Sequence, residues 1–292
     1  MAPTQSGRAG EPTAAPQQRQ SERFCSTDGD IVIFRSCDGV LFNIHRANLR
    51  AVTDGPFAED FVSSATDVAD LTEHSDILKI IFQFVYPGNL PLLEDVPPSF
   101  LFLIAEAAEK YRVAPAMAVC HLKIQGITGY LSGSFVLQKM AYAYRHGYIE
   151  LMDEAAPGSL KKTSQNALEI MGVGILYIAW TLYKEAWTKI FTKNSYMLRM
   201  QNHHGLTNVE CEAWTALVYA VERGLGEDRT SSPNALHFLF FGKEEIAEEC
   251  KHLHDSGTTH CRHQLTLWKD TVAKEAKRIP PLSYFVSAVK TG

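Results

Sequence analysis

The first part of the chain alternates between short apolar runs and turn-forming residues. Two runs rich in β-branched and aromatic residues, 30–35 and 40–45, are separated by Ser-Cys-Asp-Gly. An Asp-Gly pair between two such runs is a strong signal for a β-hairpin. Phe42 and Ile44 alternate with polar neighbours, so the second strand should bury one face. A further short strand is expected at 68–71, and the pattern predicts a small sheet.

Helical spacing takes over after this sheet. From Ser75, a residue suited to the N-cap position, apolar residues recur at i, i+3, i+4, i+7 and i+8. These positions form one stripe made of Ile77, Ile80, Ile81, Phe84 and Val85. Pro87-Gly88 should end this helix, and two further helices are expected to open at 97–99 and at Pro115.

Beyond Gly126 the pattern is helical throughout. Large side chains at positions i, i+4, i+7 and i+11 form a stripe on one helix face, which is expected to be buried in the core and not to line a cofactor pocket. It consists of Leu176, Trp180, Tyr183 and Trp187. The uncharged run 170–183 is shorter than the roughly 20 residues that a membrane span needs, so it predicts a buried core helix. Three more helices are expected at 209–223, 235–253 and 265–278.

Composition divides the chain into three parts. Residues 1–23 are rich in Pro, Gln and Ser and lack large apolar side chains, so they are predicted to be disordered. The glycines between 126 and 133 place a boundary there. We therefore expect one domain at 24–126 and a helical region at 127–292.

Net charge and cysteine usage limit the classes of binding partner and the cellular compartment that we expect. The formal net charge is −5, so no strong positive field exists to attract nucleic acid or an anionic membrane. The six cysteines are scattered, unlike those of a disulfide scaffold, and no apolar signal segment is evident at the start. The expected compartment is the cytoplasm or the nucleus.

Four blocks of sequence resemble the BTB (POZ) domain family. They are GVLFNIHRANL at 39–49, DGPF at 54–57, IIFQFVYPG at 80–88 and AEAAEKYRV at 105–113. The resemblance implies an α+β fold in which a small sheet packs on a cluster of helices. It also implies that the chain binds other proteins. Many family members self-associate, and some are substrate adaptors for cullin-type ubiquitin ligases.

Some features of the family pattern differ here. Long BTB forms carry a helix before the first strand that supports a swapped dimer, whereas residues 1–23 resemble the short form. Adaptor members carry a hydrophobic-x-Glu motif where this chain has FVSSATD at 61–67, without a Glu. Residues 136–160 are similar to the helical pairs that follow BTB domains in large fungal families, which implies an all-α C-terminal region.

Two Cys-x-His pairs near the C-terminus are the main candidates for metal chemistry. Cys250 with His252, and Cys261 with His263, could supply the four ligands of a zinc ion. Zinc-binding pairs usually leave two to four residues between ligands, whereas each pair here leaves one. Helix-end histidines beside two buried cysteines are one alternative. A Cys250–Cys261 disulfide, which requires an oxidising compartment, is another.

Other chemical signals are absent from the sequence. It contains no nucleophile elbow, phosphate loop or dinucleotide fingerprint. His45 is expected to be structural, bridging hairpin and helix. The sequence thus predicts a protein-protein interaction module without catalytic residues or cofactors. The alternatives are a cullin-ligase substrate adaptor and a C-terminal zinc site.

Overall fold

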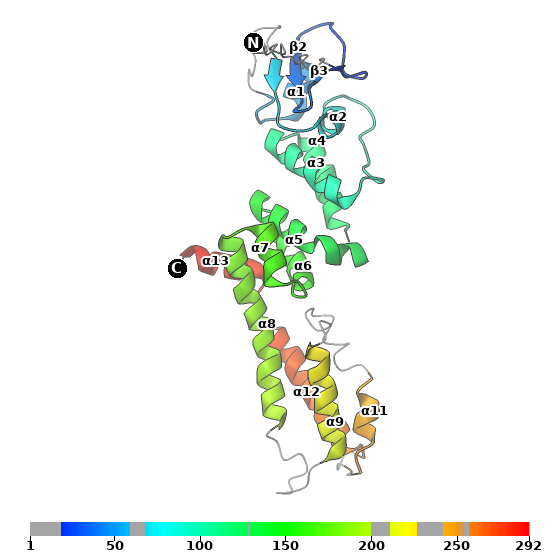
Figure 1. The fold of residues 1–292 in the computed structure, drawn as a ribbon, viewed down its shortest axis with the longest axis vertical. Helices are drawn as coiled ribbons and strands as arrows, with labels where there is room; N and C mark the ends of the chain where they lie inside the picture. The colour runs from blue at the N-terminus through cyan, green and yellow to red at the C-terminus, as the bar shows by residue number, and fades with distance from the viewer. Residues whose placement is uncertain are drawn as a thin grey trace, which may run out of the picture. The chain divides into compact units, whose positions relative to one another are not determined.

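The structure is a computed structural model of the chain. It describes residues 19–58, 68–127, 129–199, 211–226, 242–251, 253 and 257–291. Contacts divide the chain into two compact units, Met1–Gly126 and Ile127–Gly292 (Figure 1). The division falls at the same residue as the boundary expected from the sequence. The fold is mixed, with one small sheet and many helices.

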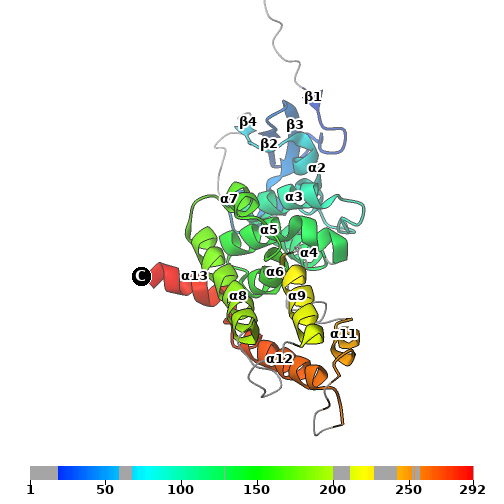
Figure 2. The same cartoon turned by 60° about the horizontal axis from the view of Figure 1, so that its bottom comes forward.

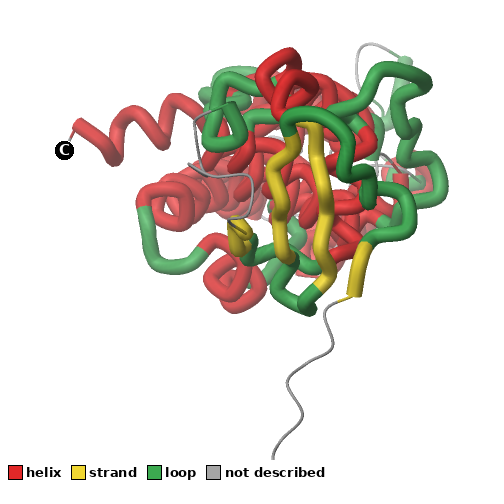
Figure 3. Tube along the Cα trace, turned by 90° about the horizontal axis from the view of Figure 1, so that it is seen from above, coloured by secondary structure: helices red, strands yellow, loops and turns green. Residues whose placement is uncertain are grey.

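A four-stranded sheet in the first unit is built around the predicted hairpin. β2 (Ile31–Arg35) and β3 (Val40–His45) are antiparallel, and Gly39 closes their turn with a φ of +82°. β4 (Val68–Asp70) pairs in parallel with β2, and β1 (Arg19–Gln20) pairs in parallel with β3. The order is therefore β1-β3-β2-β4, with the two long strands in the middle (Figure 3). The hairpin and the short strand at 68–71 are confirmed.

β1 corrects the prediction that residues 1–23 are disordered. Its pairing rests on backbone groups, because the amide of Ser21 donates to the carbonyl of Leu41 at 2.9 Å. Phe24 then anchors the segment, since it is 4% exposed and its ring lies 6.1 Å from that of Phe42. The sequence from Arg19 to Arg23 offers no large apolar side chain, so a reading based on composition missed this strand. Residues 1–18 lie outside the described residues.

Four helices complete the described part of the first unit. They are α1 (Arg46–Val52), α2 (Ser75–Gln83), α3 (Pro98–Tyr111) and α4 (Ala114–Gln125). Phe82 of α2 lies at the centre of an aromatic core, with its ring 5.4 Å from Phe34 and 5.3 Å from Phe42. The predicted stripe omitted Phe82 and included Ile80, which is only half-buried. The N-cap is His74, one residue before the predicted Ser75.

In the described residues of the second unit, the regular elements are helices, and one isolated bridge joins Leu253 to Thr259. Its helices are α5 (Gly129–His146), α6 (Ile149–Ser159), α7 (Ser164–Met171), α8 (Ile175–Arg199), α9 (Glu212–Gly226), α11 (Glu244–Glu248), α12 (His260–Ala276) and α13 (Leu282–Thr291). α5 packs against α6, and α13 packs against α8. α9, α11 and α12 lie together beside one end of α8 (Figures 1 and 2).

The aromatic stripe of α8 is core, as predicted, and Trp180 at its centre is fully buried. The run 170–183, however, is not one helix. Gly172 adopts a φ of +68°, which ends α7 before α8 begins, and Val173 is 89% exposed in the break. The helix expected at 235–253 is also wrong in its described part, where α11 ends at Glu248.

None of the helices in the described ranges is both long enough and apolar enough to span a bilayer.

Candidate functional site

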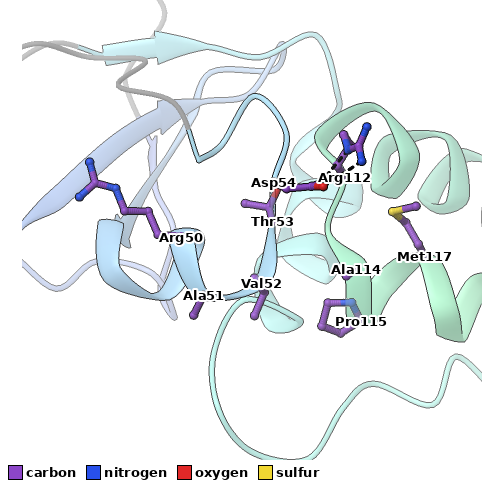
Figure 4. A pocket seen from close by; sticks show the side chains of 9 residues that line it. All are labelled: Arg50, Ala51, Val52, Thr53, Asp54, Arg112, Ala114, Pro115 and Met117. Atoms are coloured by element: carbon purple, nitrogen blue, oxygen red, sulfur yellow. Dashed lines mark hydrogen bonds and ion pairs between the residues drawn. The ribbon is translucent and has the colours of Figure 1, made fainter.

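A hollow with a volume of about 570 Å³ lies in the first unit, between the end of α1 and the start of α4. Its apolar lining comes from both helices, and Figure 4 shows the two groups facing each other. The apolar residues are Ala51, Val52, Ala114, Pro115 and Met117, and the polar ones are Arg50, Thr53, Asp54 and Arg112. A hollow of this size accommodates a few side chains of a partner or a small molecule.

The backbone that shapes the hollow is held by Thr53. Its hydroxyl donates to the carbonyl of Tyr111 at 2.6 Å and accepts from the amide of Gly55 at 3.1 Å. Arg112 adopts a left-handed conformation with a φ of +53°, which ends α3 and turns the chain into α4. A Cβ on Gly55 would lie 2.7 Å from the Cβ of Arg112, so this close approach requires glycine.

A fixed ion pair lies at the rim of the hollow (Figure 4). The Asp54 carboxylate accepts two hydrogen bonds from the Arg112 guanidinium, at 2.7 and 2.9 Å. These hydrogen bonds hold the pKa of Asp54 below its ordinary value. Arg112 therefore stabilises the ionised form of Asp54 at the rim of the hollow.

The four blocks of family-like sequence meet in pairs inside the first unit. The Nδ1 atom of His45, from the first block, is hydrogen-bonded at 2.8 Å to the hydroxyl of Tyr86, from the third. Phe57, from the second block, stacks on Tyr111, from the fourth, with ring centroids 4.1 Å apart and planes 5° from parallel. The His45 side chain thus joins the hairpin to the chain after α2, in the bridging role expected for it.

The structure regroups the candidate zinc ligands. Cys250 and Cys261 lie in one group, and the third member of this group is Cys211. The Cys211 sulfur lies 3.8 Å from that of Cys250 and 3.5 Å from that of Cys261. Among the described residues, His263 does not belong to this group, and His252 lies outside the described residues.

Sequence reasoning missed Cys211 because it searched for ligands at short spacing. Cys211 precedes Cys250 by 39 positions, so only the packing of α9 against α11 reveals the contact. Burial, together with hydrogen bonding to the two neighbouring cysteines, raises the pKa of Cys261 far above its ordinary value.

Neither the models of known protein families nor the curated proteins contain a match to this chain.

Proposed function

We propose that the first unit is a BTB-type module that binds other proteins, and that a partner docks at the hollow between α1 and α4. The convergence of the four blocks is the observation that carries the proposal. In the sequence, only the family pattern links these blocks. In the structure, His45 is hydrogen-bonded to Tyr86 and Phe57 stacks on Tyr111, so the blocks are paired in space. A chance resemblance would not require these side chains to meet.

The order of elements gives further support. A hairpin, a helix, a strand added in parallel at the edge and then three helices follow one another along the chain. This order agrees with a small sheet packed on a cluster of helices, which is the fold that the resemblance implies. On this proposal the module acts in the cytoplasm or the nucleus and needs no catalytic residue or cofactor of its own.

The lining of the hollow indicates what a partner presents. Its apolar walls suit one or two apolar side chains, whose burial would supply about 1.5–3 kcal/mol each. Of the charged side chains in the lining, Asp54 and Arg112 are paired with each other, so the apolar walls define what the hollow binds. A partner segment with an apolar anchor therefore fits the hollow best.

Affinity capture with matched variants tests the proposal. Ala51→Glu and Met117→Glu place a negative charge in the hollow, on α1 and α4 respectively. Leu122→Glu is the matched control, because Leu122 is 66% exposed on α4 and does not line the hollow. We expect the full-length chain to recover one or more proteins in stoichiometric amounts, and both hollow variants to lose them while the control keeps them.

The identity of the captured proteins distinguishes a substrate adaptor from a scaffold. A cullin with its ubiquitin machinery would assign the chain as a substrate adaptor, whereas other proteins or a second copy of the chain would assign a scaffold. Capture that survives both Ala51→Glu and Met117→Glu would remove the hollow as the docking site. A chain that captures nothing and stays monomeric would overturn the interaction module itself.

A further inference from the structure

Three helices of the second unit each bring one cysteine to a common point. Cys211 immediately precedes α9, Cys250 follows the end of α11, and Cys261 lies in the first turn of α12. Their sulfur atoms all lie within 4.8 Å of one another. Cys261 is fully buried, Cys250 is 6% exposed and Cys211 is half-buried. The thiols therefore form a cluster at the edge of the helical core, which solvent reaches from the side of Cys211.

The spacing of the sulfur atoms fits one metal ion. A tetrahedral zinc ion with Zn–S bonds of about 2.3 Å places two ligand sulfurs about 3.8 Å apart. Cys211 lies 3.8 Å from Cys250 and 3.5 Å from Cys261, sulfur to sulfur. We propose that Cys211, Cys250 and Cys261 together bind Zn²⁺ as a structural ion. This proposal does not depend on the proposed function of the first unit.

Proton loss accompanies metal binding at this cluster. Cys211 lies just before α9 and Cys261 lies in the first turn of α12, so two of the three sulfurs come from the beginnings of helices. On binding, each of the three thiols loses its proton to water and forms one Zn–S bond. Zn²⁺ with three thiolates carries a net charge of −1, which leaves one of the four zinc positions for a further ligand.

The ion would stabilise the least supported part of the unit. α11 has only five residues, too few for a helix to be stable by itself. Its contacts are with α9 and α12, across a core that includes Ala247, Trp214 and Trp268. A metal ion joining the end of α11 to the starts of both neighbours would add its binding free energy to folding. The site thus acts as a cross-link between segments distant in the sequence.

A disulfide is the competing chemistry for the same atoms. The sulfur atoms of Cys211 and Cys261 lie 3.5 Å apart, and their oxidation would release two protons and two electrons to an oxidant. Such a bond would leave Cys250 without its two partners and would exclude a three-thiolate ion. Zinc content and the mass of the unreduced chain therefore distinguish the two.

The test uses the 292-residue chain, produced in zinc-supplemented medium and purified without a chelator, with a reductant for the metal measurements and without one for the mass of the unreduced chain. Elemental analysis measures zinc per chain. Exchange with Co²⁺ then reports the ligands, since thiolate-to-cobalt charge transfer in the near ultraviolet and intense visible bands indicate a tetrahedral thiolate site. Cys211→Ser and Cys261→Ser each remove one ligand. Cys120→Ser is the matched control, because Cys120 is equally buried but lies in the first unit.

We expect one zinc ion per chain, lost in both cluster variants and kept in Cys120→Ser, together with the cobalt absorption of the unsubstituted chain. Circular dichroism checks that Cys211→Ser, which alters the half-buried cysteine, keeps its helices. If that variant fails to fold, the cobalt spectrum of the unsubstituted chain decides. Three results would each overturn the site: no stoichiometric zinc, zinc retained in both cluster variants, or an unreduced chain lighter by two hydrogens with a Cys211–Cys261 bond.

Discussion

Removing the charge of Asp38 tests how the hairpin is joined to α2. Asp38 lies in the hairpin turn, and its carboxylate accepts two hydrogen bonds at 2.8 Å, one from the amide and one from the hydroxyl of Ser75. Partial burial by itself would raise the pKa of Asp38. The hydrogen bonds from Ser75 and Ser36 outweigh that effect and lower it to about 2. The carboxylate thus binds the start of α2 in its ionised form.

The magnitude follows from linkage between ionisation and folding. A pKa lowered from 3.8 to about 2 corresponds to about 2.4 kcal/mol. The side chain is 20% exposed and lies near the surface, where solvent screening reduces this to about 1 kcal/mol. Because the folded-state pKa is the lower one, the stabilisation is complete above about pH 5. It is lost as the pH falls towards 2, with about half gone at pH 3.

Hydrogen exchange followed by mass spectrometry measures the effect on peptides that cover 31–45 and 75–83. We expect Asp38→Asn to speed exchange there by about fivefold near pH 6, which corresponds to about 1 kcal/mol, and by clearly less at pH 3. Asp95→Asn, a change at an exposed loop position, is the control and should leave these peptides unaffected. A difference between Asp38→Asn and the unsubstituted chain that stays constant from pH 6 to pH 3 would refute the reasoning.

Three further substitutions test packing and hydrogen bonding by thermal unfolding. Gly55→Ala should destabilise the first unit by about 1–3 kcal/mol, because the new Cβ would clash with Arg112. Gly174→Ala meets no atom within 4 Å and should change stability by less than about 0.5 kcal/mol, and equal effects at both glycines would contradict the clash. Ser159→Ala removes the acceptor at 2.9 Å from the buried indole N–H of Trp180 and should cost about 1–3 kcal/mol, whereas an unchanged midpoint would show that the indole finds another acceptor.

Local signals in the sequence predicted the parts of the fold that local forces decide. The Asp-Gly turn gave the hairpin, because Gly39 adopts the positive φ that the turn requires. The run 170–183 was predicted as one helix because it is uncharged and apolar, whereas one backbone angle, at Gly172, separates α7 from α8. β1 was missed because a pair of polar residues gains its order from the backbone of β3.

For the candidate sites too, the sequence predicted what depends on neighbouring residues and not what depends on the packing of distant segments. Cys250 and Cys261 were found because they lie close together in the sequence, and the structure brings their sulfurs into one cluster. Cys211 was not found, because its contact arises only when α9 packs beside α11. The hollow also had no signature in the sequence. It depends on the left-handed turn at Arg112, and an arginine gives no advance sign of that conformation.

The tryptophans belong to one unit only. All four lie beyond Gly126, at positions 180, 187, 214 and 268. Intrinsic tryptophan emission therefore arises from the second unit alone, whereas far-ultraviolet dichroism arises from both units. Emission and far-ultraviolet dichroism, recorded on one sample, can report two separate melting curves from a single chain without any introduced label.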